Sequence, residues 1–364
     1  MQIGIVGLPN VGKSTLFNAL TSVQVGAENY PFCTIDPNVG VVEVPDPRLE
    51  KLNEIYQPEK KTHATIEFVD IAGLVKGASK GEGLGNQFLS HIREVDAIAQ
   101  VVRTFTDEDI THVEGDINPV RDIEIINTEL IFADLETIER RITKVEKQAK
   151  SGEKEVLEEL DELNRLLDKL QQGINIREIK KNRYTLKIIK DLKLLSAKPI
   201  IYVCNVNEED LIYDRENEYV QQLKTYAHNQ GAKVITVSAK IESEIAELDK
   251  EEKKLFLEDL GIKNTGLDKL IKAGYELLDL IVFLTAGEKE VRAWPVRKGS
   301  SAPEAAGKIH TDMERGFIRA EVVDYNRLIK DGSLSHARDQ GNLRLEGKKY
   351  IVQDGDVCTF RFNV

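Results

Sequence analysis

An apolar run, Ile3-Gly4-Ile5-Val6, leads directly into Gly7-Leu8-Pro9-Asn10-Val11-Gly12-Lys13-Ser14-Thr15, and Leu16-Phe17-Asn18-Ala19-Leu20 follows. This order predicts a strand, a phosphate-binding loop and a helix whose positive end faces the bound anion. Lys13 would reach the outer phosphates, and the Ser14 hydroxyl would ligate Mg²⁺. A glycine-rich turn that holds a lysine by chance is the alternative, and the order of all three elements argues against it. The loop residues expected to bind nucleotide are Asn10, Val11, Gly12, Lys13, Ser14 and Thr15.

The size and composition of the chain indicate a folded protein of two or three domains, with 364 residues, 41% of them hydrophobic and 31% charged. No apolar stretch approaches the roughly 20 residues that span a bilayer, and the chain opens on the nucleotide-binding strand, so we expect a cytoplasmic protein. Its three cysteines, Cys33, Cys204 and Cys358, are widely spaced and are expected to be free thiols. The net charge of −12 argues against nucleic-acid binding by bulk electrostatics.

Several further β-rich segments alternate with helical stretches, at residues 39–44, 64–69, 98–102, 199–204 and 233–237. This alternation predicts a mainly parallel α/β sheet with the nucleotide at the carboxyl ends of its strands. One segment ends at Asp70-Ile71-Ala72-Gly73, where Asp70 would hold Mg²⁺ through water and the Gly73 N–H would meet the γ-phosphate. Thr34 is expected to be a switch hydroxyl that ligates Mg²⁺. The glycine-rich residues 77–85 are expected to form a mobile switch, with a flexible surface loop as the alternative.

The stretch Cys204-Asn205-Val206-Asn207-Glu208 stands where Ras-like GTPases carry Asn-Lys-x-Asp, whose Asp accepts hydrogen bonds from guanine. Glu208 is one methylene longer than that Asp, so guanine specificity is in doubt. A carboxylate would repel the acceptor N1 of adenine, so adenine binding requires Glu208 to turn aside. Asn205 and Val206 are expected at the base, and Ser238 and Ala239 begin a loop that would cover it.

The residue after Gly73 is Leu74, where Ras-like enzymes carry the Gln that orients the attacking water. A leucine side chain cannot hydrogen-bond a water, so hydrolysis must use another group or be slow. His112 is the candidate general base, because imidazole can accept a proton near neutral pH. A surface histidine without a catalytic role is the alternative.

Residues 121–196 differ in pattern from the rest, because apolar residues recur at steps of three and four on either side of Ser151-Gly152. The two series predict an antiparallel helical hairpin about 28 residues long, or roughly 40 Å. It could be a solvated arm or a docking surface for a large partner. The two apolar series are Ile131, Leu135, Ile138, Ile142, Val145 and Ala149, and Leu160, Leu163, Leu167, Leu170 and Ile174.

From about Val282 onward, short strand-like runs predict a small α+β domain, with strands at 317–323, 350–352 and 357–362. Trp294 lies among the basic residues Arg292, Arg297 and Lys298. It is either a core residue or a contact for nucleic-acid bases and phosphates.

The loop, the Asp70 to Asn86 stretch, Tyr30-Pro31-Phe32-Cys33-Thr34 and the Asn205-x-x-Glu208 variant resemble the YchF family of Obg-related P-loop NTPases. The resemblance covers essentially the whole chain. It implies an NTPase domain at residues 1–280, interrupted by the helical hairpin at 121–196, and a C-terminal ubiquitin-like TGS domain at 281–364. It also implies ATP hydrolysis in preference to GTP, binding to ribosomes, and a connection with translation and oxidative stress. The family's loop histidine and redox-linked cysteine match His112 and Cys33.

The expected function is therefore a slow, Mg²⁺-dependent ATPase that acts as a nucleotide-controlled switch on the ribosome, as a monomer and away from membranes. A GTP-specific GTPase connected with translation is one alternative. A ribosome- or RNA-binding module with a structural nucleotide is another, with RNA contacts through the TGS domain. Metabolic phosphotransfer is less favoured, because no acceptor-substrate pocket can be identified.

Overall fold

The computed structural model describes residues 1–22, 38–71, 84–107, 112–150 and 152–363. Thr34, Gly73, Cys33 and Leu74 lie outside these residues, as do most of the predicted switch residues 77–85. Two compact units are present. The first contains the N-terminal strand and helix with Glu67–Gly274, and the second contains Val41–Ile66 and Tyr275–Val364.

One six-stranded sheet has the order β2-β4-β1-β5-β6-β7, and its strands β1, β5, β6 and β7 lie in the first unit. Neighbours from β4 to β7 pair in parallel, and all seven residues of β5 are buried. The predicted parallel α/β sheet is therefore confirmed. The strands are β1 (Gln2–Val6), β2 (Val39–Val44), β4 (Ala64–Asp70), β5 (Ala97–Arg103), β6 (Ile200–Asn205) and β7 (Lys233–Val237).

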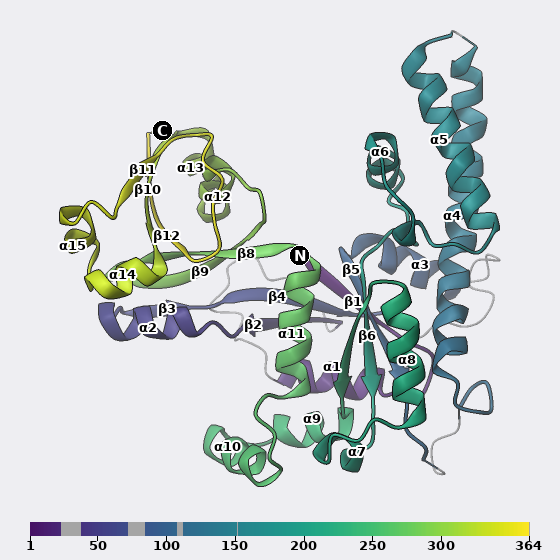
Figure 1. Ribbon diagram of the computed structural model, residues 1–364, viewed down its shortest axis with the longest axis horizontal. Coiled ribbons are helices and arrows are strands. Elements are labelled where there is room, and N and C mark those ends of the chain that lie inside the picture. Colours follow the sequence, from purple (N-terminus) through teal and green to yellow (C-terminus); the bar gives the residue numbers. More distant parts are fainter. Residues whose placement is uncertain (23–37, 72–83, 108–111, 151, 364) are drawn as a thin grey trace. The chain divides into compact units, whose positions relative to one another are not determined.

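Helices connect these strands, and Figure 1 shows α8 beside β6. The helix after the phosphate loop buries Leu16, Phe17, Ala19 and Leu20. Burying this face fixes the position of the loop that precedes it. The helices are α1 (Lys13–Ser22), α3 (Leu84–Glu94), α7 (Glu208–Ile212), α8 (Glu218–Asn229), α9 (Ala239–Ala246), α10 (Lys250–Asp259) and α11 (Gly266–Leu277).

The inserted hairpin consists of α4 (Pro119–Ala149) and α5 (Lys154–Gln171), which run side by side in Figure 1. Gly152 takes a φ of 75° in the turn between them, as the turn prediction requires. The arm is shorter than predicted, because α5 has 18 residues and spans only about 27 Å. The first part of α4 lies beyond α5 and packs within the first unit, where Ile123, Ile126 and Leu130 are fully buried.

The seam between α4 and α5 contains Ile138, Val145, Leu163 and Leu170, as predicted, together with Leu166, which the sequence pattern missed. Two short helices follow α5, namely η3 (Ile176–Glu178) and α6 (Arg183–Leu192).

A buried carboxylate ties the hairpin to the strand that follows it. Asp134 is fully buried and accepts hydrogen bonds from the backbone N–H groups of Leu195 and Ser196, each at 2.8 Å, and from the Ser196 hydroxyl at 2.7 Å. Burial raises the pKa of Asp134. These contacts join α4 to the turn before β6, so the base of the arm is fixed to the nucleotide sheet.

The second unit contains a second six-stranded sheet in the order β11-β10-β12-β8-β9-β3. The predicted strands at 317–323 and 357–362 are confirmed as β10 and β12. The predicted strand at 350–352 is wrong, because Ile351 forms only an isolated bridge with Ser301. The strands are β3 (Lys60–Thr62), β8 (Leu280–Ala286), β9 (Glu290–Arg297), β10 (Phe317–Asp324), β11 (Arg344–Glu346) and β12 (Asp356–Phe362).

One strand of this sheet comes from far earlier in the chain, because β3 pairs in parallel with β9 through Lys60 and Glu290. The core of the sheet contains Phe283, Phe317 and Phe360 and is covered by alanines of α12. The helices of this unit are α2 (Pro47–Tyr56), α12 (Ala302–Ile309), α13 (Thr311–Arg315), α14 (Tyr325–Asp331) and α15 (Leu334–Asp339). Across the described parts of both units, we find no helix with the length and apolar character of a membrane span.

Candidate nucleotide site

The phosphate loop has the backbone geometry that its glycines predict. Gly12 has a φ of 91°, and a Cβ atom at this position would lie 2.2 Å from the Asn205 side-chain nitrogen. Asn10 also has a positive φ, of 62°. At Gly7 an added Cβ would approach the Val101 carbonyl oxygen to 2.8 Å. Gly12 is thus required by its positive φ and by its approach to Asn205, whereas Gly7 is required by its close approach to the Val101 carbonyl.

The charged and hydroxyl groups of the loop stand at the start of α1, whose first backbone hydrogen bond runs from Leu16 N–H to the Gly12 carbonyl at 3.0 Å. Lys13 Nζ lies 2.5 Å from Asp70 Oδ1, at the end of β4, while Ser14 is exposed. The parallel register of Ile5 with Asp70 sets the carboxylate beside the strand that leads into the loop. The structure therefore brings the predicted residues Lys13 and Asp70 together.

The oxygen groups at this point fit the ligand preference of Mg²⁺, which takes few protein ligands and completes its shell with phosphates and water. Ser14 supplies a hydroxyl, and Asp70 supplies a carboxylate. Among the described residues, no three His, Cys, Asp or Glu side chains gather into a metal site of their own.

Asn205 connects the phosphate loop to the predicted base loop. Its Nδ2 donates to the Val11 carbonyl at 2.9 Å, and its Oδ1 accepts from the Ala239 N–H at 3.0 Å. The side chain is 4% exposed. Two parts of the predicted site, far apart in sequence, therefore meet at one amide side chain.

The other residues predicted at the base have distinct positions. Val206 is buried, and its N–H donates to the Val237 carbonyl. The Ser238 hydroxyl oxygen is buried and has no hydrogen-bond partner within the described part of the chain. Glu208 is partly exposed and pairs with Lys240, a residue that the sequence analysis did not select. This contact lowers the pKa of Glu208 and raises that of Lys240.

His112 is buried rather than exposed at the surface, so the alternative of a surface histidine is wrong. Its Nδ1 accepts from the Glu114 N–H at 3.2 Å, and its Nε2 lies 2.8 Å from Asp122 Oδ2. Since Nδ1 is an acceptor here, Nε2 carries the proton and donates it to the carboxylate. Both ring nitrogens are therefore engaged in this arrangement.

Asp122, like Lys240, was not identified from the sequence. It lies in the first turn of α4, and its other oxygen receives a hydrogen bond from Arg121 at 3.3 Å. Burial raises the pKa of Asp122, and the interactions with His112 and Arg121 oppose that rise. The interval of ten residues between His112 and Asp122 gave no periodic signal, because the intervening segment is neither helix nor strand.

Glu242 lies four residues beyond Ser238 on α9 and is almost fully buried. Its Oε1 accepts a 2.5 Å hydrogen bond from the Gly266 N–H at the start of α11, while its Oε2 has no partner within the described residues. Burial raises the pKa of Glu242 to about 7. The Glu242 carboxylate thus joins α9 to the start of α11, and its burial makes the free energy of folding depend on pH.

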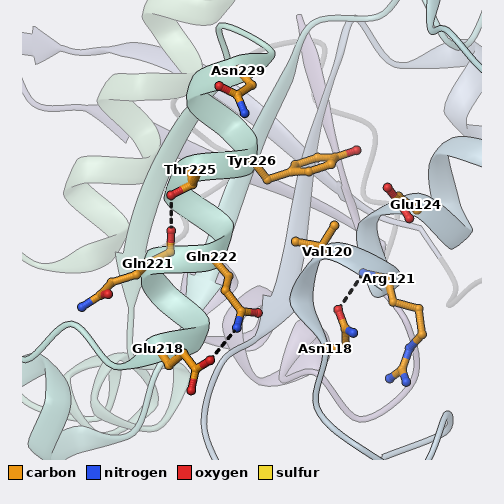
Figure 2. Close-up of a pocket in the computed structure, with 10 residues that line it drawn as sticks. All are labelled: Asn118, Val120, Arg121, Glu124, Glu218, Gln221, Gln222, Thr225, Tyr226 and Asn229. Atoms are coloured by element: carbon orange, nitrogen blue, oxygen red, sulfur yellow. Dashed lines mark hydrogen bonds between the residues drawn. The ribbon is translucent and has the colours of Figure 1, made fainter.

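A separate polar groove of about 660 Å³ lies between α8 and the start of α4, and Figure 2 shows Tyr226 pointing from α8 toward Glu124. The Arg121 N–H donates to Asn118 Oδ1 at the rim. None of the residues that line it belongs to the predicted nucleotide site.

In the C-terminal unit, Trp294 is a packing residue. The Arg292 guanidinium carbon lies 3.9 Å from the centre of the Trp294 ring, which also stacks on Phe283 with its centroid 6.2 Å away. Its Nε1 donates to Thr285. Trp294 thus packs against the core of the sheet while it stays partly exposed. Cys204 and Cys358 are buried free thiols, as expected.

Family models match both parts of the chain. The model YchF-GTPase_C, described as a protein of unknown function (DUF933), matches residues 280–363. The model MMR_HSR1, described as a 50S ribosome-binding GTPase, matches residues 2–132.

Whole-length relatives agree with these matches. The chain is 57% identical to the Ribosome-binding ATPase YchF of Bacillus subtilis over 100% of both chains. It is 55% identical to the protein of the same name from Haemophilus influenzae, over 100% of this chain and 99% of the relative. The solved structure of the Schizosaccharomyces pombe YchF GTPase is 39% identical and superposes with a TM-score of 0.89, covering 99% of this chain and 97% of that one. With a P-loop nucleotide-binding fold and relatives that match it from end to end, this chain belongs to the YchF family.

Proposed function

We propose that the protein is a slow, Mg²⁺-dependent ATPase whose nucleotide state controls its binding to the ribosome. The main support for the ATP preference is the Glu208–Lys240 ion pair. It engages the carboxylate that would otherwise accept hydrogen bonds from guanine. The names of relatives differ on the base, since the Bacillus subtilis protein is called an ATPase and the Schizosaccharomyces pombe protein a GTPase. The base preference must therefore be argued from this chain's own residues.

In the proposed complex, Lys13 leaves Asp70 and contacts the outer phosphates, and the backbone of residues 10–15 surrounds them. Ser14, Thr34 and Asp70 would hold Mg²⁺, which when bound neutralises charge on the phosphates. Gly73 would donate its N–H to the γ-phosphate. At the base, Asn205, Val206, Ser238 and Ala239 would contact adenine with Glu208 turned aside.

His112 is proposed as the general base that takes a proton from the attacking water. In the position observed, neither ring nitrogen can take a proton, because Nε2 already carries one and the Nδ1 lone pair accepts from the Glu114 N–H. His112 must therefore leave this position before it can act as a base. The proposed enzyme is therefore slow on its own, and a partner that shifts the segment around His112 would accelerate it. Leu74 cannot replace His112 in this role, because its side chain forms no hydrogen bonds.

The proposed partner and location of the protein are based on the names of its relatives. The printed name of the Bacillus subtilis and Haemophilus influenzae proteins includes ribosome binding, and we propose the same partner and hence a cytoplasmic location for this chain. We propose an NTPase domain at residues 1–280 with the hairpin at 121–196, and a TGS domain at 281–364 that contributes RNA contacts. We also propose that the protein acts as a monomer.

The competing function is a ribosome-binding module whose nucleotide is only structural. Co-sedimentation with ribosomes in ATP, ADP or no nucleotide separates the two. The switch predicts that the bound fraction changes with nucleotide and that Lys13→Ala abolishes the change. Equal binding in all three conditions, and by the Lys13 variant, would favour the structural role.

A further inference from the structure

The two bases present opposite hydrogen-bonding groups at the edge that the protein reads. Guanine offers donors at N1 and N2 and an acceptor at O6, whereas adenine offers a donor at N6 and an acceptor at N1. A free carboxylate suits guanine, because it accepts from N1 and N2, and it repels the acceptor N1 of adenine. A site that prefers adenine must therefore keep such a carboxylate engaged elsewhere.

The sheet register explains how Glu208 meets Lys240. Asn205 on β6 pairs with Val237 on β7, and both strands run in the same direction. Glu208 follows Asn205 by three residues and starts α7, while Lys240 follows Val237 by three residues in the first turn of α9. Because the two strands end together, the two side chains leave the same edge of the sheet and meet.

The surroundings of the pair favour this contact. Asn207 caps α7 by accepting from the Asp210 N–H at 2.7 Å, which fixes the backbone at Glu208. Lys240 is 68% exposed and has Glu244 and Asp107 nearby, whose charges also stabilise its ammonium group. The pair is partly exposed to solvent, so its contribution is modest.

We propose that Lys240 is a positioning residue that sets base selectivity by holding Glu208 away from the nucleotide base. This inference rests on the proposed ATP preference and names Lys240 as the residue that maintains that preference. Without Lys240, Glu208 is free to accept from guanine N1 and N2 and to repel adenine N1. Selectivity should then shift toward guanine.

Equilibrium binding of ADP and GDP with Mg²⁺ tests this proposal, because diphosphates avoid turnover and share every contact except the base. The variants are Lys240→Ala, Lys240→Arg, Glu208→Ala and the double variant Glu208→Ala/Lys240→Ala. The measured quantity is the ratio of GDP to ADP affinity, in which any general loss of positive charge near the phosphates cancels.

We expect Lys240→Ala to raise this ratio about two- to fivefold, the range available to a partly exposed ion pair. Lys240→Arg should retain the wild-type ratio, because it keeps the pair. The double variant should match Glu208→Ala, because Lys240 acts only through Glu208. An unchanged ratio in Lys240→Ala, or an equal shift with and without Glu208, would overturn the proposal. A wild-type protein that strongly prefers GDP would instead refute the proposed ATPase function, whatever Lys240 does.

Discussion

The imidazole Nε2 of His112 lies 2.8 Å from Asp122 Oδ2, and both side chains are only 3% exposed. This contact joins the segment before α4 to the first turn of that helix. In this position Nε2 donates a hydrogen bond to Asp122 and the Nδ1 lone pair accepts from the Glu114 N–H, so neither nitrogen is free to take a proton. The restraint would give a physical reason for the slow hydrolysis that we propose.

Removing the restraint should therefore speed the reaction. We expect Asp122→Ala to raise ATP turnover about tenfold, since a hydrogen bond to a charged group contributes about 1.5–3 kcal/mol and each 1.4 kcal/mol is a factor of ten. Steady-state phosphate release measures this. Asp116→Ala is the matched control, because Asp116 also pairs with Arg121 but does not contact His112.

His112→Ala should lose turnover while it keeps ATP affinity, and Asp122→Ala/His112→Ala should be as slow as His112→Ala alone. If Asp122→Ala were instead as slow as His112→Ala, Asp122 would orient the imidazole for catalysis and the restraint would be refuted.

Asp70 should matter for the metal more than for the nucleotide itself. Asp70→Asn keeps the size of the side chain but removes the charge beside Lys13. We expect ATP affinity in Mg²⁺ to fall at least tenfold and affinity in EDTA to change little, as measured by calorimetry. An equal loss in both conditions would mean that Asp70 has no metal role.

Glu242 should make folding stability depend on pH. Its folded pKa of about 7 lies above the ordinary value of 4.5, so the folded state binds the proton more tightly than the unfolded chain does. The contribution of Glu242 to stability is then fully present below pH 4.5 and is lost as the pH rises through 7, by about 3 kcal/mol at most at 1.36 kcal/mol per pKa unit.

Glu242→Gln keeps the acceptor for the Gly266 N–H and removes the charge. Its free energy of unfolding, relative to wild type, should increase between pH 5 and 8 in urea titrations. Glu244→Gln, on an exposed position of the same helix, should show no such trend. A difference between Glu242→Gln and wild type that stays constant over this pH range would contradict the burial argument.

The anchor of the helical arm should be important for stability. Asp134→Ala leaves two buried N–H groups and one hydroxyl without their acceptor, so we expect a loss of about 2–4 kcal/mol in the free energy of unfolding. Ser196→Ala removes only one of these bonds and should cost about 1 kcal/mol. Equal losses in urea titrations of the two variants would show that the backbone contacts contribute little.

The sequence predicted those features that local pattern determines. The phosphate loop could be predicted because Gly7, Gly12 and Lys13 have fixed spacing between a strand and a helix. The strands of the first sheet could be predicted because β-rich segments alternate with helical segments along the chain. In the hairpin, the apolar spacing located Leu163 and Leu170 but missed Leu166, because a straight helix drifts from a strict seven-residue repeat.

Contacts between distant residues could not be predicted in the same way. The pairing of Lys60 with Glu290 joins strands some 230 residues apart, and no local signal identified β3 as part of that sheet. Lys240 and Glu208 meet because of strand register, and His112 meets Asp122 across an irregular segment. Residues 350–352 contain apolar and aromatic side chains typical of a strand, yet they form a single bridge.

The central claim is that this YchF protein selects adenine. The most direct test is the affinity of purified wild-type protein for ATP and for GTP in Mg²⁺, measured by calorimetry under identical conditions. The Glu208–Lys240 pair predicts tighter binding of ATP. A hundredfold preference for GTP would contradict this account.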